Sequence, residues 1–361
     1  MAIEGLRKFG WDDKWEKAFR EYGEKGLLPA RVSFQNQHVY RLYMEDGEIA
    51  AEIAGRLRYE AESNADLPAV GDWVAVKPGV GRDGMRIHAV LPRRTQFARK
   101  TVGAKTEAQI VGANVDVVLL VTSMNQDFNP RRIERYLANA WDTGAEPVVV
   151  LSKADLCEEP EKLLVEARAA APGVAVHMIS IRTGDGVAGV LEHFGEGRTV
   201  ALVGTSGVGK SSLINFILGE ERQAVNAVRE HDDRGQHTTR HRELIVLAGG
   251  GLVLDTPGMR ELQLWEAESG VSGTFEDVEE LAAACFFSDC KHETEPRCAV
   301  REAVEKGELD AQRLASYLKL NEEIKQLSER REEYQKKLEQ KGKRKLHRAV
   351  KEISSRKRSG S

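Results

Sequence analysis

An octapeptide near the middle of the chain, GTSGVGKS at residues 204–211, leaves few folds open to this sequence. It fits the pattern GxxxxGK[ST] and stands between an apolar run, TVALV, and a helical pattern, SLINFIL. In this setting the glycines let backbone N–H groups surround phosphate oxygens, and the helix N-terminus adds positive partial charge. A glycine-rich turn with an exposed lysine is the alternative, but it would not require the full spacing and both flanks. We therefore predict a phosphate-binding loop (P-loop) in an α/β fold.

The position of each residue in the predicted P-loop indicates its role in binding phosphate or Mg²⁺. We expect Lys210 to reach the β- and γ-phosphates and Ser211 to bind Mg²⁺. Downstream, DTPG follows the apolar run GLVL, so Asp255 is a second candidate for Mg²⁺ and the N–H of Gly258 a candidate donor to the γ-phosphate. The nucleotide-binding positions predicted from these two motifs are Gly204, Thr205, Ser206, Gly207, Val208, Gly209, Lys210, Ser211, Ser212, Asp255 and Gly258.

A second apolar run, EPVVVL, ends in the tetrapeptide SKAD at residues 152–155, which resembles the NKxD element of GTPases. A carboxylate at Asp155 can accept hydrogen bonds from N1–H and N2–H₂ of guanine, a pair of donors that adenine lacks. The stem of Lys153 can cover the base. Ser152 replaces the usual asparagine and removes an amide that braces neighbouring loops, which predicts a modest affinity. The alternative for Ser152 and Asp155 is a helix N-cap.

Another loop, ISIR at residues 179–182, also follows an apolar run, and its Ser180 is a candidate for closing over the base. In Ras-like GTPases the base-reading loops follow the P-loop, whereas here Asp155 precedes Lys210 by 55 residues. Loops at the carboxyl ends of parallel strands meet in space whatever their order, and nearby termini permit circular permutation. We therefore predict a permuted GTPase domain for GTP and GDP.

The polar stretch RGQHTT at residues 234–239 precedes the DTPG motif. Thr238 or Thr239 is expected to complete the Mg²⁺ shell when the γ-phosphate is present. Ras-like enzymes orient the attacking water with a glutamine just after the DxxG glycine, but this chain has Met259 there. We predict that His237 performs this task and is catalytic together with Lys210. A solvated loop histidine is the alternative.

Three of the four cysteines cluster with a histidine: Cys285, Cys290, His292 and Cys298. Three thiolates and an imidazole within 14 residues suit tetrahedral Zn²⁺ with no open position, as in a structural site. Buried free thiols and redox chemistry are the alternatives. The prediction is one structural zinc ion.

The remaining patterns suggest the organisation of the chain. Residues 9–23 have the spacing of a short amphipathic helix, and about five strand-like runs between residues 31 and 94 suggest a small barrel. Apolar β-branched runs from residue 115 to 254 alternate with helical stretches, which is typical of a parallel sheet covered on both faces. A long helical pattern begins at Asp310. The predicted parts are an N-terminal helical extension (1–30), a barrel (31–96), the GTPase domain (97–270), a zinc-binding helical domain (271–340) and a basic tail (341–361).

Composition excludes several classes of protein. With 41% hydrophobic and 30% charged residues, the 361-residue chain is neither disordered nor collagenous. No apolar run approaches the roughly 20 residues of a membrane helix, and the charged N-terminus is unlike a secretory signal, so we expect no membrane contact and a cytoplasmic location.

Charge restricts contact with nucleic acid to particular surfaces, because the net charge of −4 combines an acidic body with a basic tail. The basic residues after the barrel are either RNA contacts or a solvated face: Arg93, Arg94, Arg99, Lys100 and Lys105. The tail is either a phosphate-binding segment or a solubilising end.

Together the barrel with GDWV at residues 71–74, the permuted order, GTSGVGKSSLIN, RGQHTT, DTPG and CFFSDCKHETEPRCAV resemble the RsgA family of circularly permuted GTPases. The resemblance runs from about residue 31 to 317. It implies an OB-fold barrel, a central GTPase domain and a zinc-binding helical domain. It also implies docking on the small ribosomal subunit and its rRNA near the decoding region, late in maturation. His237 matches the family's proposed catalytic histidine, whereas Ser152 and the long basic tail depart from the commonest pattern.

The function implied by these motifs and by the resemblance to the RsgA family is a monomeric GTPase of ribosome assembly. GTP would order residues 229–240 and 255–260 and favour docking on the immature small subunit, which stimulates hydrolysis, and hydrolysis would release the protein. The alternative is a zinc-stabilised RNA-binding adaptor whose nucleotide site is a switch with negligible turnover. A P-loop kinase is disfavoured because no motif suggests an acceptor for the phosphoryl group.

Overall fold

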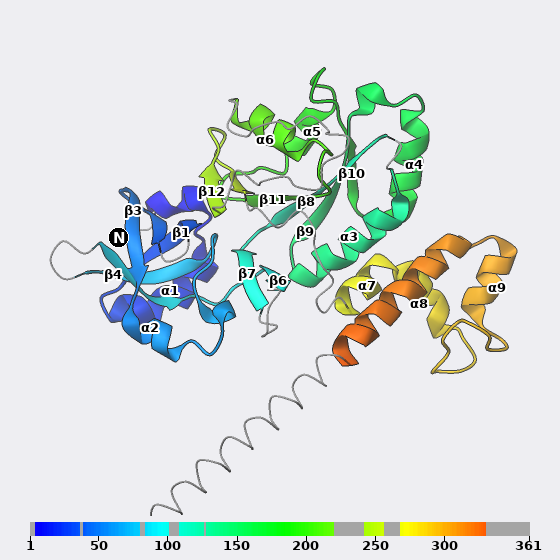
Figure 1. Ribbon diagram of the computed structural model, residues 1–361, viewed down its shortest axis with the longest axis horizontal. Coiled ribbons are helices and arrows are strands. Elements are labelled where there is room, and N and C mark those ends of the chain that lie inside the picture. The colour runs from blue at the N-terminus through cyan, green and yellow to red at the C-terminus, as the bar shows by residue number, and fades with distance from the viewer. Residues whose placement is uncertain are drawn as a thin grey trace, which may run out of the picture.

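The computed structural model describes residues 4–36, 39–79, 84–100, 108–125, 128–219, 242–255 and 268–329. Three parts follow one another across the molecule: a barrel, a central sheet flanked by helices, and a helical module (Figure 1). Among the described residues, no helix combines the length and apolar character needed to cross a membrane.

The N-terminal segment forms two short helices instead of the one expected over residues 9–23. A 3-10 helix, η1 (Glu4–Phe9), is followed by Gly10, whose φ of 88° ends it, and then by α1 (Asp13–Glu24). Asp12 is the N-cap of α1, and its Oδ1 accepts hydrogen bonds from the backbone N of Lys14 and Trp15 at 3.0 and 2.9 Å. This cap fixes the start of the helix at Asp13, because it satisfies two of the free N–H groups of the first turn.

The predicted barrel is present and closed. Its strands pair in the order β1-β2-β3-β5-β4, and β4 returns to pair with β1, as in a five-stranded OB-fold. Alternate side chains such as Val32, Leu42, Trp73 and Ile87 are fully buried inside it. The elements are β1 (Leu28–Asn36), β2 (Val39–Met44), β3 (Gly47–Ile53), α2 (Gly55–Glu60), η2 (Asn64–Asp66), β4 (Trp73–Pro78) and β5 (Met85–Val90).

The central sheet has five parallel strands in the order β10-β9-β8-β11-β13, with β12 added antiparallel to β13. Both faces of the sheet are buried, as the apolar runs predicted. Val118 and Leu120 of β8 pack with α3 and α4, whereas Val117 and Leu119 pack with α5 and α6. The elements are β8 (Val117–Ser123), α3 (Pro130–Thr143), β9 (Glu146–Ser152), η3 (Ala154–Leu156), α4 (Pro160–Ala170), β10 (Ala175–Met178), α5 (Val187–Leu191), β11 (Thr199–Val203), α6 (Lys210–Leu218), β12 (Arg242–Val246) and β13 (Leu252–Asp255).

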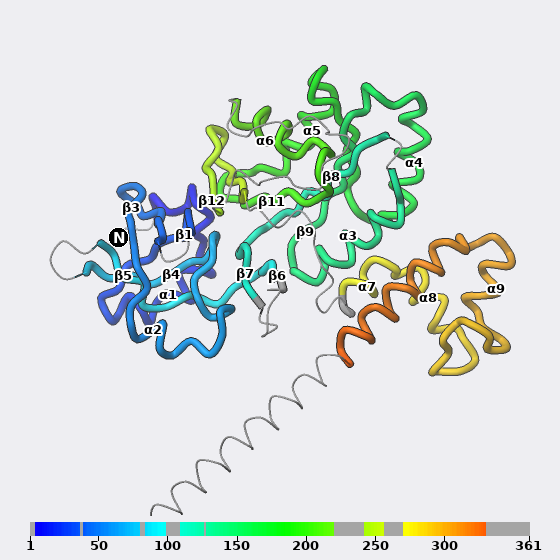
Figure 2. Tube along the Cα trace, viewed as in Figure 1, coloured from blue at the N-terminus to red at the C-terminus, as the bar shows by residue number. Residues whose placement is uncertain are grey.

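Two features join the barrel to the central sheet. Strand β1 pairs with β12, Phe34 opposite Glu243 and Gln35 opposite Arg242, so the strand order runs without a break from one part to the other. A hairpin of β6 (Gln96–Lys100) and β7 (Ala108–Ala113), not predicted from the sequence, lies between them (Figure 2).

The helical module contains α7 (Glu268–Thr274), α8 (Glu276–Ala283), α9 (Ala299–Lys306) and a helix over residues 311–329. It packs on α3, where a Cβ added to Gly270 would lie 1.8 Å from the carbonyl oxygen of Ala138. Only glycine fits at such a close approach. The predicted tail, residues 341–361, lies outside the described residues.

A buried arginine ties this module to helix α3, which flanks the central sheet. Arg313 donates to both carboxylate oxygens of Asp277 at 2.7 and 2.8 Å, to Glu134 of α3 at 3.0 Å and to the carbonyl of Thr274 at 2.9 Å. Glu134 is fully buried. Because an unpaired carboxylate is costly there, this contact holds the two parts together.

Candidate functional site

The predicted P-loop joins β11 to α6 at the carboxyl edge of the central sheet. Gly204 has a φ of 152°, and a Cβ on it would lie 2.2 Å from the carbonyl oxygen of Val121 in the neighbouring strand. Gly207 and Gly209 have φ values of 80° and 96°. These three glycines are therefore required by the backbone path of the loop.

Helix α6 begins at Lys210, so its first N–H groups face the loop, as phosphate binding needs. The Nζ of Lys210 donates to the carbonyl oxygens of Gly204 and Thr205, both at 2.6 Å. The ammonium group is thereby held against the loop. Ser211 and Ser212 lie in the first turn of α6, and Ser206 lies in the loop itself.

The predicted base-reading loop contacts the P-loop directly. The buried hydroxyl of Ser152, at the end of β9, donates to the carbonyl of Val208 at 2.6 Å. Next to it, the Nζ of Lys153 donates to the carbonyl of Gly207 at 2.6 Å, and the backbone of Lys153 is left-handed with a φ of 61°. Ser152 therefore still braces the two loops, although it lacks an amide.

Asp155 is held as an ionised acceptor. Its Oδ1 accepts a hydrogen bond from the hydroxyl of Ser180 at 2.8 Å, and its Oδ2 pairs with Nε of Arg182 at 2.9 Å. Ser180 first, and the charge of Arg182 more weakly, hold the pKa of Asp155 below its ordinary value. The N-cap alternative does not apply, because Lys153 precedes η3 and no side-chain cap bond is present there. Arg182 was not predicted as a partner of Asp155; its position two residues after Ser180 was the available signal.

Asp255 is the last residue of β13, which lies beside β11 in the parallel sheet. Both strands end at the same edge, so Asp255 and the P-loop face one region, as a pair of Mg²⁺ contacts must. The predicted His237, Thr238, Thr239 and Gly258 lie outside the described residues. Their places in the site stay predictions.

The four predicted zinc ligands come together near α8 and α9. Their ligand atoms all lie within 4.8 Å of one another. The Sγ of Cys285 is 3.6 Å from Nδ1 of His292 and 3.8 Å from Sγ of Cys298, and the distance from Nδ1 of His292 to Sγ of Cys298 is 3.4 Å. Tetrahedral Zn²⁺, with bonds of about 2.3 Å to sulfur and 2.0–2.1 Å to nitrogen, places its ligands about 3.5–3.8 Å apart. With Cys290 as the fourth donor, the cluster fits a structural zinc ion.

Two of the basic residues after the barrel make contacts that support the fold. Arg93 binds both oxygens of the buried Asp72, at 2.9 and 2.7 Å, and two backbone carbonyls. Arg94 pairs with Asp12, and its guanidinium lies 4.1 Å from the ring centroid of Trp15. The side chain of Arg93 is thus largely buried, whereas that of Arg94 remains 36% exposed. The side chains of residues 99 and 100, and residue 105, are not among those described.

Comparison with known proteins agrees with this architecture. The sequence matches the family model RsgA GTPase over residues 90–265 and the model 50S ribosome-binding GTPase over residues 199–339. The protein named small ribosomal subunit biogenesis GTPase RsgA from Opitutus terrae is 48% identical over 328 residues, covering 88% of this chain and 89% of that protein. Its counterpart in Syntrophotalea carbinolica is 44% identical with the same coverage.

Two solved structures share the fold. YjeQ from Thermotoga maritima aligns with a TM-score of 0.63 and 28% identity, covering 82% of this chain and 98% of that one. YloQ, described as a circularly permuted GTPase, aligns with a TM-score of 0.61 and 27% identity over 83% and 96% of the two chains. The permuted order predicted from the sequence is thus confirmed, and the chain belongs to the RsgA family of GTPases.

Proposed function

We propose that this protein acts in biogenesis of the small ribosomal subunit and hydrolyses GTP at the carboxyl edge of its central sheet. One observation carries the assignment: the loop with Asp155 is fastened to the P-loop through Ser152 and Lys153. A guanine held by Asp155 therefore belongs to the same ligand as a phosphate chain held by the P-loop. The relatives named above support the ribosomal role.

The residues of the P-loop bind and orient the phosphates. Lys210 moves from its carbonyl acceptors to the β- and γ-phosphates, and the N–H groups that open α6 point at the same oxygens. Ser211 and Asp255, with Thr238 or Thr239, hold Mg²⁺, which neutralises charge on the phosphates when bound. Asp155 selects guanine, with Ser180 fixing its carboxylate. The other loop positions named above surround the phosphates with backbone N–H groups.

His237 accepts a hydrogen bond from the attacking water and orients it towards the γ-phosphate, since Met259 has no group able to do so. Contact with the small subunit and its rRNA aligns this histidine, and hydrolysis weakens that contact and releases the protein. We place this activity in the cytoplasm and in a monomer.

The proposed parts of this chain are the N-terminal extension (1–30), the barrel (31–96), the GTPase domain (97–270), the zinc-binding domain (271–340) and the basic tail (341–361). The Cys₃His cluster holds one Zn²⁺ and stabilises the fold of residues 271–340. Its role is structural, since four protein donors leave no position open.

Phosphate release, measured with and without purified small subunits, tests the proposal. We expect slow release alone and strong stimulation by subunits, with His237→Ala losing the stimulated rate while keeping nucleotide affinity. Lys210→Ala is expected to lose GTP affinity. Negligible turnover in the presence of subunits would instead describe an adaptor, and unchanged turnover of His237→Ala would remove that residue from the mechanism.

A further inference from the structure

A cavity at one end of the barrel is separate from the proposed GTP site. It has a volume of about 410 Å³ and opens between η1, the start of β1, the β2–β3 turn and the start of β5. All of these elements belong to the N-terminal extension and the barrel, whereas the P-loop belongs to the central sheet (Figure 1). A ligand in this cavity would therefore be bound independently of the nucleotide.

The walls of this cavity are apolar. Two large side chains on them, Leu28 and Ile49, stay 42% and 39% exposed. Apolar surface left in water favours a partner that covers it. Two of the lining side chains are methionines, which are flexible and adapt to an incoming group. The apolar residues of the lining are Leu6, Leu28, Pro29, Met44, Ile49 and Met85.

The charged side chains that line the cavity are acids. Glu45, Asp46 and Glu48 lie at the β2–β3 turn, and among the described residues no lysine, arginine or histidine joins them on the lining. Glu48 is already engaged, since it accepts a hydrogen bond from Ser33 at 2.6 Å and pairs with Arg41 at 3.7 Å. The carboxylates of Glu45 and Asp46 have no hydrogen bond or ion pair with any described residue. Two acids without a described counter-ion therefore flank an apolar cavity.

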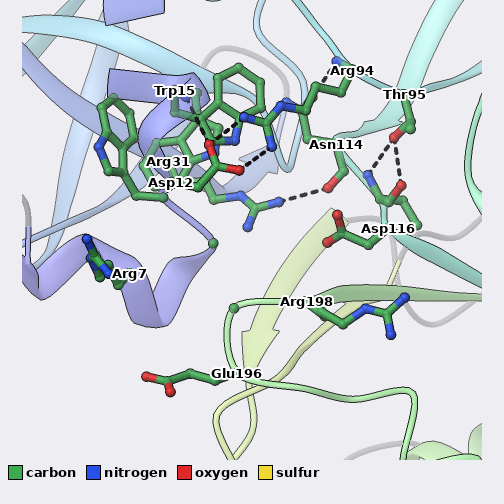
Figure 3. Close-up of a pocket in the computed structure, with 15 residues that line it drawn as sticks. Arg7, Asp12, Trp15, Arg31, Arg94, Thr95, Asn114, Asp116, Glu196 and Arg198 are labelled. Carbon is green, nitrogen blue, oxygen red and sulfur yellow. Dashed lines mark hydrogen bonds and ion pairs between the residues drawn. The ribbon is translucent and has the colours of Figure 1, made fainter. Parts of the chain in front are cut away.

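The wall formed by η1 is held in place. The ring of Phe9, the last residue of η1, stacks on Tyr43 of β2 with the ring centroids 4.6 Å apart, and its carbonyl accepts a hydrogen bond from the buried Arg31. The same guanidinium also donates to the carbonyl of Asn114 at 3.0 Å, at the junction with the central sheet (Figure 3). A ligand therefore meets a cavity that is already shaped, which lowers the cost of binding.

The position of Glu45 is also restricted by this wall. A Cβ added to Gly5 would lie 2.7 Å from Cγ of Glu45, so the stem of the glutamate packs on the backbone of η1. Glycine leaves the room that this contact needs. The carboxylate is thereby kept beside the cavity that it lines.

This combination suits a basic protein segment and opposes a nucleic acid. Glu45 and Asp46 repel phosphate groups, and none of the described lining residues offers an aromatic ring on which a base could stack. The same two carboxylates attract lysine and arginine side chains. An aliphatic side chain between such residues would leave water for the apolar walls.

We propose that this cavity binds a basic segment of a partner protein. One aliphatic side chain of the segment is inserted against Leu28 and Ile49, and the lysine or arginine residues that flank it face Glu45 and Asp46. The barrel thus has a protein-binding surface at this end, and the inference does not depend on the nucleotide site.

Fluorescence anisotropy of labelled peptides, measured with the full-length protein at fixed ionic strength, tests this proposal. The probe is the peptide Lys-Lys-Leu-Lys-Lys, with serine in place of leucine in one control and glutamate in place of lysine in the other. We expect saturable binding of the leucine peptide, about tenfold weaker binding of the serine peptide and none of the glutamate peptide. Equal affinity for the leucine and serine peptides, or no saturable binding of the leucine peptide, would overturn the proposal.

Two variants, each with a matched control, locate the contact. Ile49→Ser should weaken binding of the leucine peptide about fivefold, whereas Val39→Ser, at a 56% exposed position of β2 outside the cavity, should not. Glu45→Gln should weaken it about two- to fivefold, whereas Glu62→Gln, at an exposed acid outside the cavity, should not. Circular dichroism checks that each variant is folded. Wild-type affinity in a folded Ile49→Ser or Glu45→Gln variant would contradict the proposal.

Two further arms distinguish other occupants of the cavity. In the full-length chain, Leu346→Ser removes an aliphatic residue that stands among basic residues of the tail, and the affinity for the leucine peptide should not change. Tighter binding would show that the chain's own tail competes for the cavity, against the assignment to a partner. Labelled single-stranded RNA should bind Ile49→Ser and Val39→Ser equally; weaker binding by Ile49→Ser alone would assign the surface to RNA and overturn the proposal.

Discussion

Replacing Ser152 by alanine should weaken nucleotide binding, although this side chain need not touch the nucleotide. Its hydroxyl donates to the carbonyl of Val208 at 2.6 Å and is 2% exposed, so the change leaves a P-loop carbonyl without its donor. An acceptor orphaned in this way costs about 1–3 kcal/mol. Without nucleotide, the loop can move so that the carbonyl of Val208 bonds to water, but it must resume its original path to bind phosphate. We therefore expect about 1–2 kcal/mol of this cost to appear in the free energy of nucleotide binding, which is a loss of affinity of roughly 5- to 30-fold.

Calorimetric titration of GTP and of GDP measures this loss. Both nucleotides should weaken by the same factor, because the hydrogen bond holds the loop rather than the γ-phosphate. Ser33→Ala is the matched control: this barrel serine is also buried and donates to Glu48 at 2.6 Å, so its loss should lower stability without altering nucleotide affinity. Unchanged affinity of Ser152→Ala, or weakening of GTP alone, would refute the bracing role.

Three other predictions concern the base, the zinc cluster and the joint between domains. Asp155→Asn should weaken GTP far more than ATP in competition assays, and equal effects would reject base reading. Chelation of zinc should unfold much of residues 268–329 and expose the three cysteines to a thiol reagent; retained helicity by circular dichroism would argue against structural zinc. Arg313→Met should cost about 3–5 kcal/mol in denaturant unfolding, because Glu134 stays buried without this partner, and a loss below about 1 kcal/mol would show that Arg131 alone suffices.

Local patterns predicted most of the elements that position the site. The strands of the barrel are recognisable as short runs in which apolar and polar residues alternate, and those of the central sheet as continuous apolar runs. The P-loop was predictable residue by residue, since its backbone path demands glycine at fixed spacing and a helix immediately afterwards. The Cys₃His cluster was predictable because cysteines and a histidine that lie close in sequence also lie close in space.

Contacts between distant segments were not predictable in the same way. Arg93 and Arg94 looked like surface charges because their partners, Asp72 and Asp12, lie 21 and 82 positions away. The β6–β7 hairpin is short and mixed in polarity, so no alternation revealed it. That Ser152 reaches Val208 depends on β9 and β11 both flanking β8, a matter of strand order that spacing alone does not give.

Strand β12 connects the central sheet to the barrel, because it pairs with β13 on one edge and with β1 on the other. Strand β12 begins at Arg242, directly after the segment that includes the predicted His237, and its other edge is the barrel strand β1. A displacement of β12 would act on the pairs Phe34 with Glu243 and Gln35 with Arg242, which link it to the barrel. The barrel and the central sheet are thus joined at β12 both by this main-chain pairing and by the hydroxyl of Tyr43, which donates to the carbonyl of Leu244 at 2.9 Å.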